Sequence, residues 1–230
     1  MSTIRSYIIP PAAASLAIIP VYYGFVAKSA KQLGNPIPRF NLNNTVVGGF
    51  KAAPTIGAIV GTQMIAQRFI EQSLERYANV TTEPSFVKMF AAAVGGGILS
   101  APALAILNGQ TMGQGVIESL SKLTLKQTSL IVIRESSFLF SIRISDPVGL
   151  LMRERLGDNA TVDYASAFIS GAIGSVIGHP ADTLLTLAQK GIKVQSWRHM
   201  MQGAMIKAVA VGGFSLGYKA TRQFFETIGK

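Results

Sequence analysis

Six apolar segments, each about as long as a bilayer is thick, constrain this chain more than any other feature. They lie near residues 7–28, 44–70, 86–108, 123–145, 162–188 and 204–225. A helix of about 20 residues crosses the hydrocarbon core of a membrane. Only 14% of the 230 residues are charged, whereas soluble domains carry about 25%. The sequence therefore predicts an all-α membrane protein with six transmembrane helices.

The net charge of +10 is unevenly distributed between the connections. The connection 28–39 contains Lys28, Lys31 and Arg39 without an acidic residue, and 190–198 is also purely basic. Basic connections mark one side of a membrane, so this charge indicates topology rather than a nucleic-acid partner. The chain has no cysteine and two separated histidines, so neither a thiolate nor a histidine-based metal site is expected.

Two series of residues recur along the chain at similar intervals. Pro20, Pro102 and Pro180 are the first series, and Lys51, Arg134 and Lys207 are the second. Three units of two helices explain both series, and internal repeats are common in transporters. We therefore expect a single domain, 1–230, of three pseudo-threefold repeats near residues 1–75, 84–157 and 160–227.

The third unit carries the most specific motif. Asp182 follows Pro180 by two residues, and Gln189 lies nine residues past this proline. With the segments 51–63 and 218–222, this pattern resembles the mitochondrial carrier family, whose odd-numbered helices read Pro-x-[Asp/Glu]-x-x-[Lys/Arg]. The resemblance implies six tilted helices around a central cavity in the mitochondrial inner membrane. It also implies both termini on the intermembrane-space side and the basic connections in the matrix.

The chain departs from this family at the charged positions of the motif. Counted from the three prolines, the acid positions hold Tyr22, Leu104 and Asp182, and the base positions hold Phe25, Leu107 and Leu185. In the family, these acids and bases form ion pairs that close the cavity on the matrix side. The sequence therefore predicts that apolar packing closes the cavity, with no such pair between repeats. The connection within each repeat is also short and leaves little room for the family's matrix helix.

Asp182 has two interpretations. It is either a remnant of the gate that pairs with Lys207 or Lys190, or a helix-kink acid satisfied by backbone groups or water. The second is favoured, because one acid cannot form a gate network. Gln189 is then an interfacial hydrogen-bonding residue.

Further residues are candidates for ligand or lipid contact. Lys51, Arg134 and Lys207 either converge on a central cavity and attract an anion, or extend to an aqueous surface or a lipid phosphate. The resemblance implies a cardiolipin phosphate site near Lys190, Gly191 and Gly203. The run Gly95–Gly97 is expected to pack helices closely, including helices of partner subunits.

Two functions fit the sequence. The favoured one is a non-transporting accessory subunit of a large inner-membrane assembly, such as a respiratory chain complex or ATP synthase, because the gate pairs are missing. The alternative is an active transporter of a small organic anion or nucleotide, supported by the three bases. No nucleophile with a base is apparent, so no enzymatic activity is expected. The expected partners are membrane lipids and complex subunits, and no cofactor is expected beyond a structural phospholipid.

Overall fold

The secondary structure is helical throughout the part of the chain described by this computed structural model. The described residues are 2–77, 86–157 and 159–228, and no strand occurs among them. The helices are α1 (Ser2–Gln32), α2 (Leu42–Tyr77), α3 (Phe86–Thr111), α4 (Val116–Ser121), α5 (Leu125–Leu156), α6 (Ala160–Ile177), α7 (His179–Gln189), α8 (Trp197–Met200) and α9 (Ala204–Ile228). The all-α class predicted from the sequence is confirmed.

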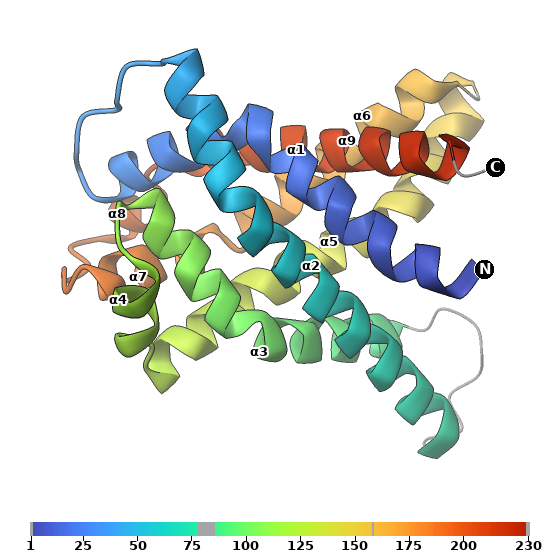
Figure 1. The fold of residues 1–230 in the computed structure, drawn as a ribbon, viewed down its shortest axis with the longest axis horizontal. Coiled ribbons are helices and arrows are strands. Elements are labelled where there is room, and N and C mark those ends of the chain that lie inside the picture. The colour runs from blue at the N-terminus through green and yellow to red at the C-terminus, as the bar shows by residue number, and fades with distance from the viewer. Residues whose placement is uncertain (1, 78–85, 158, 229–230) are drawn as a thin grey trace.

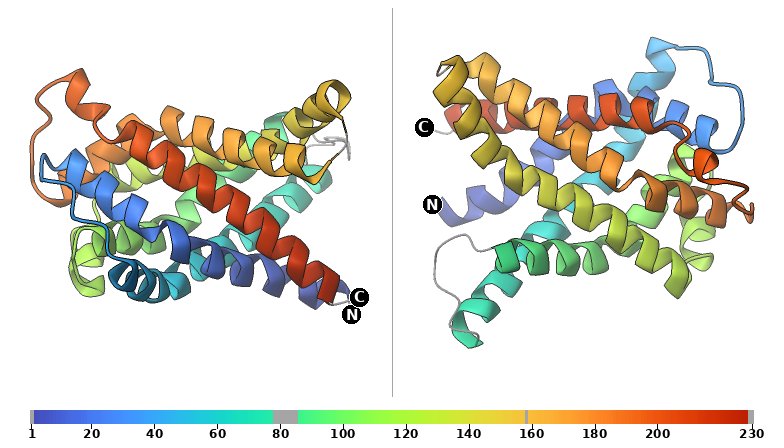
Figure 2. Two further views of the ribbon diagram at one scale, coloured as in Figure 1. Left: turned by 90° about the horizontal axis from the view of Figure 1, so that it is seen from above. Right: turned by 180° about the vertical axis from the view of Figure 1, so that it is seen from behind.

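The long helices pack in a closed ring. Contacts run from α1 to α2, then to α3, α5, α6 and α9, and α9 packs against α1. The two termini lie at one end of the molecule, while α4, α8 and the connection between α1 and α2 lie at the other (Figure 1). The same arrangement is visible from above and from behind (Figure 2). A ring of this kind encloses a core, to which α1, α2, α3, α5 and α9 contribute buried apolar side chains.

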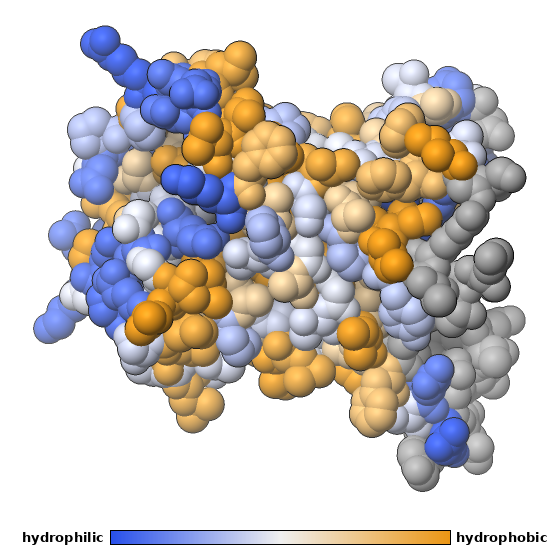
Figure 3. All heavy atoms as spheres, viewed as in Figure 1, coloured by the Kyte–Doolittle hydropathy of each residue, from blue (hydrophilic) through white to orange (hydrophobic). Residues whose placement is uncertain are grey.

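Three of these helices are long and apolar enough to cross a membrane. The qualifying segments are Tyr7–Gln32, Phe90–Thr111 and Ala160–Ile177. The other long helices carry more polar side chains, some of which are buried inside the protein, such as Gln63 on α2 and Lys207 on α9. On the face shown in Figure 3, patches of apolar side chains lie along the middle of the molecule among residues of intermediate hydropathy, and hydrophilic side chains gather at the end that carries α4 and α8.

The three prolines of the first series affect their helices differently. Pro20 and Pro102 lie inside α1 and α3, which continue past them. At Pro180 the helix is interrupted: α6 ends at Ile177, Gly178 is its C-cap, and α7 begins at His179. A proline is tolerated in a first helical turn, because its missing N–H has no partner there. The helix near Pro180 is therefore broken rather than only kinked, and the break lies at Gly178, two residues before the proline.

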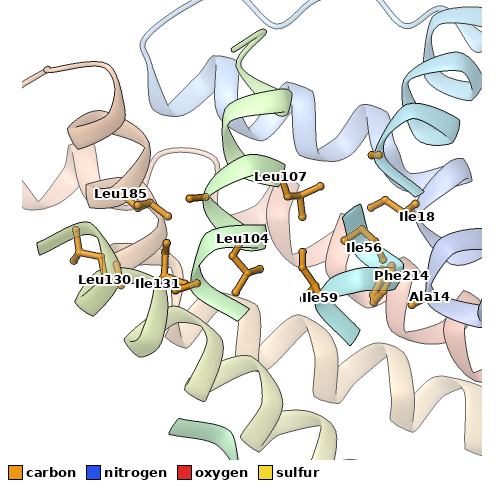
Figure 4. Close-up of a cluster of buried hydrophobic side chains, with 14 of the residues drawn as sticks. Ala14, Ile18, Ile56, Ile59, Leu104, Leu107, Leu130, Ile131, Leu185 and Phe214 are labelled. Carbon is orange, nitrogen blue, oxygen red and sulfur yellow. The ribbon is translucent and has the colours of Figure 1, made fainter. Parts of the chain in front are cut away.

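Many of the buried apolar side chains form a cluster in the centre of the ring. It combines α1, α2, α3, α5, α7 and α9, and its residues include Ile18, Ile56, Leu104, Ile131, Leu185 and Phe214 (Figure 4). Leu185 and Ile131 are completely buried. Leu104, Leu107 and Leu185 belong to this cluster, and Tyr22 and Phe25 pack against it. The apolar side chains predicted to lie together near the closure therefore do so.

Glycines bring α3 close to α2 and α5. A Cβ added at Gly96 would lie 3.3 Å from Leu139 Cδ1, and one at Gly97 would lie 3.4 Å from the Cα of Val132. Both glycines are buried inside the protein. The close helix packing expected at Gly95–Gly97 is thus confirmed, but Gly96 and Gly97 face helices of the same chain. The expectation that they contact partner subunits is wrong, because the ring itself covers them.

Two of the connections contain a short helix where little room for one was expected. In the connection after α3, Glu118 of α4 accepts hydrogen bonds from Gln114 (3.0 Å) and from Lys122 (2.7 Å). These bonds lower the pKa of the Glu118 carboxyl. In the connection after α7, the Ser196 side chain caps α8. Buried His179 contacts the carbonyl oxygen of Gln202 at 2.9 Å, so this connection is held against α7.

Candidate functional site

One buried carboxylate, that of Asp182, binds cationic side chains from three other helices. Lys28 of α1 donates to Oδ2 at 2.9 Å, and Arg134 of α5 donates to Oδ1 at 2.9 Å. The Lys207 ammonium of α9 lies 3.5 Å from Oδ2. Asp182 is 1% exposed. Its position in the first turn of α7 is also favourable, because a helix N-terminus stabilises negative charge.

Neutral polar side chains complete the surroundings of this carboxylate. Gln32 Nε2 donates to Asp182 Oδ2 at 3.0 Å and to Thr183 Oγ1 at 2.8 Å. Thr186 donates to Gln32 Oε1 at 2.9 Å. Lys28 also reaches Asn108 Oδ1 of α3 at 3.5 Å. The network therefore connects α1, α3, α5, α7 and α9 in the middle of the protein.

A second carboxylate, that of Glu135, lies beside this network. It is 4% exposed and accepts a hydrogen bond from Gln63 of α2 at 2.9 Å. Its Oε2 lies 3.6 Å from Nη2 of Arg134. Arg134 thus stands between two carboxylates, and the guanidinium suits this position because it presents several donors in a rigid plane.

The charged side chains line a cavity of about 100 Å³. The charged residues among its described lining are Lys28, Arg134, Lys207, Asp182 and Glu135. Apolar side chains such as Phe25, Leu104 and Phe214 form much of the remaining wall. A cavity with apolar walls and a few convergent polar groups is the usual form of a small-molecule site. No group of three or more acidic or histidine side chains suited to a metal ion was found among the described residues.

Of the three basic residues expected either to converge on a cavity or to extend to a surface or a lipid, two converge. Arg134 and Lys207 line the cavity and contact Asp182. Lys51 is exposed and does not belong to the described cavity wall. Lys28 of α1 takes the third position instead. Sequence reasoning placed Lys28 in a basic connection, because nothing local distinguishes it from Lys31.

The favoured interpretation of Asp182 is wrong. Its carboxylate is satisfied by Lys28, Arg134, Lys207 and Gln32 rather than by backbone groups or water at an interface. The pairing with Lys207, which was the alternative, is present. The expectation that no ion pair joins the proline-containing helices of different repeats is also wrong, because Lys28 of α1 pairs with Asp182 of α7.

The ends of α1, α3 and α7 explain this error. The second residue after the end of each helix is a glycine with positive φ: Gly34 (73°), Gly113 (75°) and Gly191 (68°). Positive φ at this position is the common way to end a helix. Lys28, Leu107 and Leu185 each precede their glycine by six residues. Lys28 therefore occupies the base position of α1, and counting from Pro20 shifted the register by three residues.

The same register relates two glutamines. Gln32 and Gln189 each precede their glycine by two residues, and Thr111 holds this place in α3. Gln189 is buried, accepts from Asn108 and donates to the carbonyl of Ala105 at 3.2 Å. Gln189 thus joins α7 to α3, as Gln32 joins α1 to α7. Its interfacial hydrogen-bonding role is confirmed, at an interface between helices.

The residues proposed for lipid contact lie at the end that carries α8. Lys190 is exposed and donates to the carbonyl of Met112 at 3.4 Å. Gly191 is exposed, whereas a Cβ added at Gly203 would lie 3.2 Å from the Lys28 carbonyl oxygen. Lys190 and Gly191 are accessible to a lipid headgroup, whereas a glycine is needed at position 203 because its φ is +83°.

Charged residues at the opposite end connect neighbouring helices of the ring. Arg153 of α5 donates to both carboxylate oxygens of Asp163 on α6, at 2.8 and 2.6 Å. Lys219 of α9 donates to the Asp163 carbonyl at 3.2 Å. These contacts join α5, α6 and α9 side by side.

Comparison with protein-family models and with curated proteins found no match for this chain.

Proposed function

We propose that this protein is a non-transporting, carrier-like subunit of a large assembly in the mitochondrial inner membrane. The observation that supports this most strongly is the convergence of three cations on one carboxylate, Asp182. The positions equivalent to Asp182 in α1 and α3 hold Phe25 and Leu104, which cannot form further gate pairs. In this proposal, six helices in three two-helix repeats span the bilayer around a closed centre.

The contacts at the opposite end support the same proposal. Alternating access needs a gate at each end, with one closed while the other is open. Arg153, Asp163 and Lys219 hold three adjacent helices, α5, α6 and α9, together at this end. Side chains arranged in this way stabilise a fixed scaffold.

Native electrophoresis of mildly solubilised membranes tests this proposal. We expect the protein to migrate within an assembly far larger than its 24.4 kDa chain, and its deletion to reduce the amount of that assembly. Liposomes that contain the purified chain should exchange neither carboxylates nor nucleotides above background. Migration as a free monomer together with an unchanged assembly pattern would contradict the proposal.

A second candidate function is transport of a small organic anion. The observation that favours it is the excess of cationic over anionic side chains around the cavity, together with a Lys28–Asp182 pair that a substrate anion can break. Saturable anion uptake should then be lost in a Lys28→Ala, Arg134→Ala, Lys207→Ala variant. It should persist in Lys190→Ala, which removes a cation outside the cavity.

A further inference from the structure

The charges around the central cavity do not cancel. Lys28, Arg134 and Lys207 contribute three positive charges, and Asp182 and Glu135 contribute two negative charges, so the described lining has a net charge of +1. Lys28 and Lys207 are 3% and 6% exposed. An uncompensated charge removed from water is costly, which favours binding of a counter-charge.

The two carboxylates already have closer partners than the third cation. Asp182 is bound at 2.9 Å by both Lys28 and Arg134, and Glu135 is bound at 2.9 Å by Gln63. Lys207 reaches Asp182 only at 3.5 Å, the longest of the three cation contacts. An ammonium has three N–H donors. The excess positive charge is therefore concentrated at Lys207, with Arg134 beside it.

The size of the cavity limits what can balance this charge. Its volume is about 100 Å³, whereas a cavity of about 150 Å³ accommodates benzene. Pockets for drug-sized ligands range from about 300 to 1,000 Å³. A nucleotide does not fit, but an anion of one to about five heavy atoms does.

We infer that the central cavity binds one small monovalent anion between Lys207 and Arg134. The net charge of the five buried side chains decides whether the cavity binds a monovalent or a divalent anion more tightly. A monocarboxylate such as acetate and a halide such as chloride both have the small size and the single negative charge that this site requires. The inference goes beyond the proposed function, because a static subunit can hold such an anion as a permanent part of its core.

Titration calorimetry on the purified full-length chain at constant ionic strength tests this inference. The probes are acetate, chloride and sulfate. The wild-type protein should bind acetate or chloride about tenfold more tightly than sulfate, since a second negative charge finds no partner. The tighter binder of these two monovalent anions then shows whether the cavity holds a carboxylate or a halide.

Variants that remove single charges then change the charge sum. Glu135→Gln raises it to +2 and should reverse the preference toward sulfate. Adding Lys28→Gln, which leaves Lys207 and Arg134 in place, returns the sum to +1 and should restore the monovalent preference, which excludes misfolding of the first variant as the cause. Lys190→Gln removes a cation outside the cavity and should leave all affinities unchanged.

Three results would overturn the inference. The first is the absence of binding by every probe, as expected if Lys207 loses its proton and balances the site itself. The second is that Glu135→Gln still binds acetate or chloride more tightly than sulfate. The third is equal weakening by Lys190→Gln and Lys207→Gln. Each can occur whether or not the protein is part of a larger assembly, so the proposed function is tested separately.

Discussion

At the scale of single residues, Asp182 determines the state of the protein's centre. Its carboxylate is the shared partner of Lys28, Arg134 and Lys207. Buried charges stabilise a fold only while they remain compensated. Removing the carboxylate leaves three cations facing one another, whereas removing one cation leaves the carboxylate with two partners. Loss of Asp182 should therefore destabilise the fold more than loss of any one of the three cations.

We predict that Asp182→Asn destabilises the protein by about 3–5 kcal/mol, the usual cost of leaving a buried partner uncompensated. Lys28→Met should cost less, because Arg134 and Lys207 still contact the carboxylate. Denaturant unfolding in detergent measures both. Glu154→Gln removes an exposed carboxylate and is the control, with no measurable change expected. Equal losses for Asp182→Asn and Lys28→Met would show that Asp182 has only one significant partner.

Exchanging the charges of Lys28 and Asp182 should not restore the stability that is lost in Lys28→Asp. In an isolated ion pair, Lys28→Asp combined with Asp182→Lys restores the attraction. Here a lysine at position 182 meets Arg134, whose Nη1 is now 2.9 Å from Asp182 Oδ1, and Lys207. Like charges at such distances repel. The double variant should unfold at a temperature no higher than Lys28→Asp alone, and full recovery would contradict a shared network.

At the scale of helices, close contact between α1 and α2 depends on glycine. A Cβ added at Gly49 would lie 2.6 Å from the Cα of Ile19 and 2.9 Å from its carbonyl oxygen. Backbone atoms cannot move aside as the end of a side chain can. Gly61 lies further along α2 and faces the same helix, but its added Cβ would be 3.5 Å from Pro11 Cγ, an ordinary contact.

Alanine substitutions separate these two glycines. Gly49→Ala should destabilise the protein by about 1–3 kcal/mol, the usual cost of overpacking a well-packed site. Gly61→Ala should be neutral or slightly stabilising, because alanine favours a helix more than glycine does. Thermal unfolding in detergent compares the two. A larger loss for Gly61→Ala would indicate that α1 and α2 approach each other differently.

Helix α1 also shows where a motif search along a sequence goes wrong. Pro20 lies three residues before Tyr23, the position equivalent to Pro102 and Pro180 when the chain is aligned on Gly34, Gly113 and Gly191. A proline inside a helix is a conspicuous sequence signal. The end of the helix is the more reliable reference, because a positive φ is a geometric requirement that few residues other than glycine meet.

At the scale of the whole molecule, the long helices of the ring run between two opposite ends (Figure 1). The proposed six-span topology predicts that these ends lie on opposite sides of a membrane. The chain has no native cysteine, so single cysteines can report this directly. Asn35 and Val194 are exposed in the connections after α1 and α7, and Thr227 is exposed near the end of α9.

A membrane-impermeant maleimide applied to sealed vesicles should label Asn35→Cys and Val194→Cys from the same side. It should label Thr227→Cys only from the other side. The unmodified chain is the control and should remain unlabelled. Labelling of all three positions from one side would contradict six spans and support a protein that lies on the membrane surface.

The sequence by itself determined the helical class and the positions of the long helices. Apolar segments of membrane-spanning length depend on composition over about 20 neighbouring residues, which is local information. It also identified Asp182, Arg134 and Lys207 as exceptional, because charges within apolar segments are costly wherever they occur. Only the tertiary structure decided that Lys28 joins them and Lys51 does not. Which of two similar lysines meets a carboxylate on a distant helix depends on the ring closure and on the helix ends, and neither leaves a sufficient signal near the residue itself.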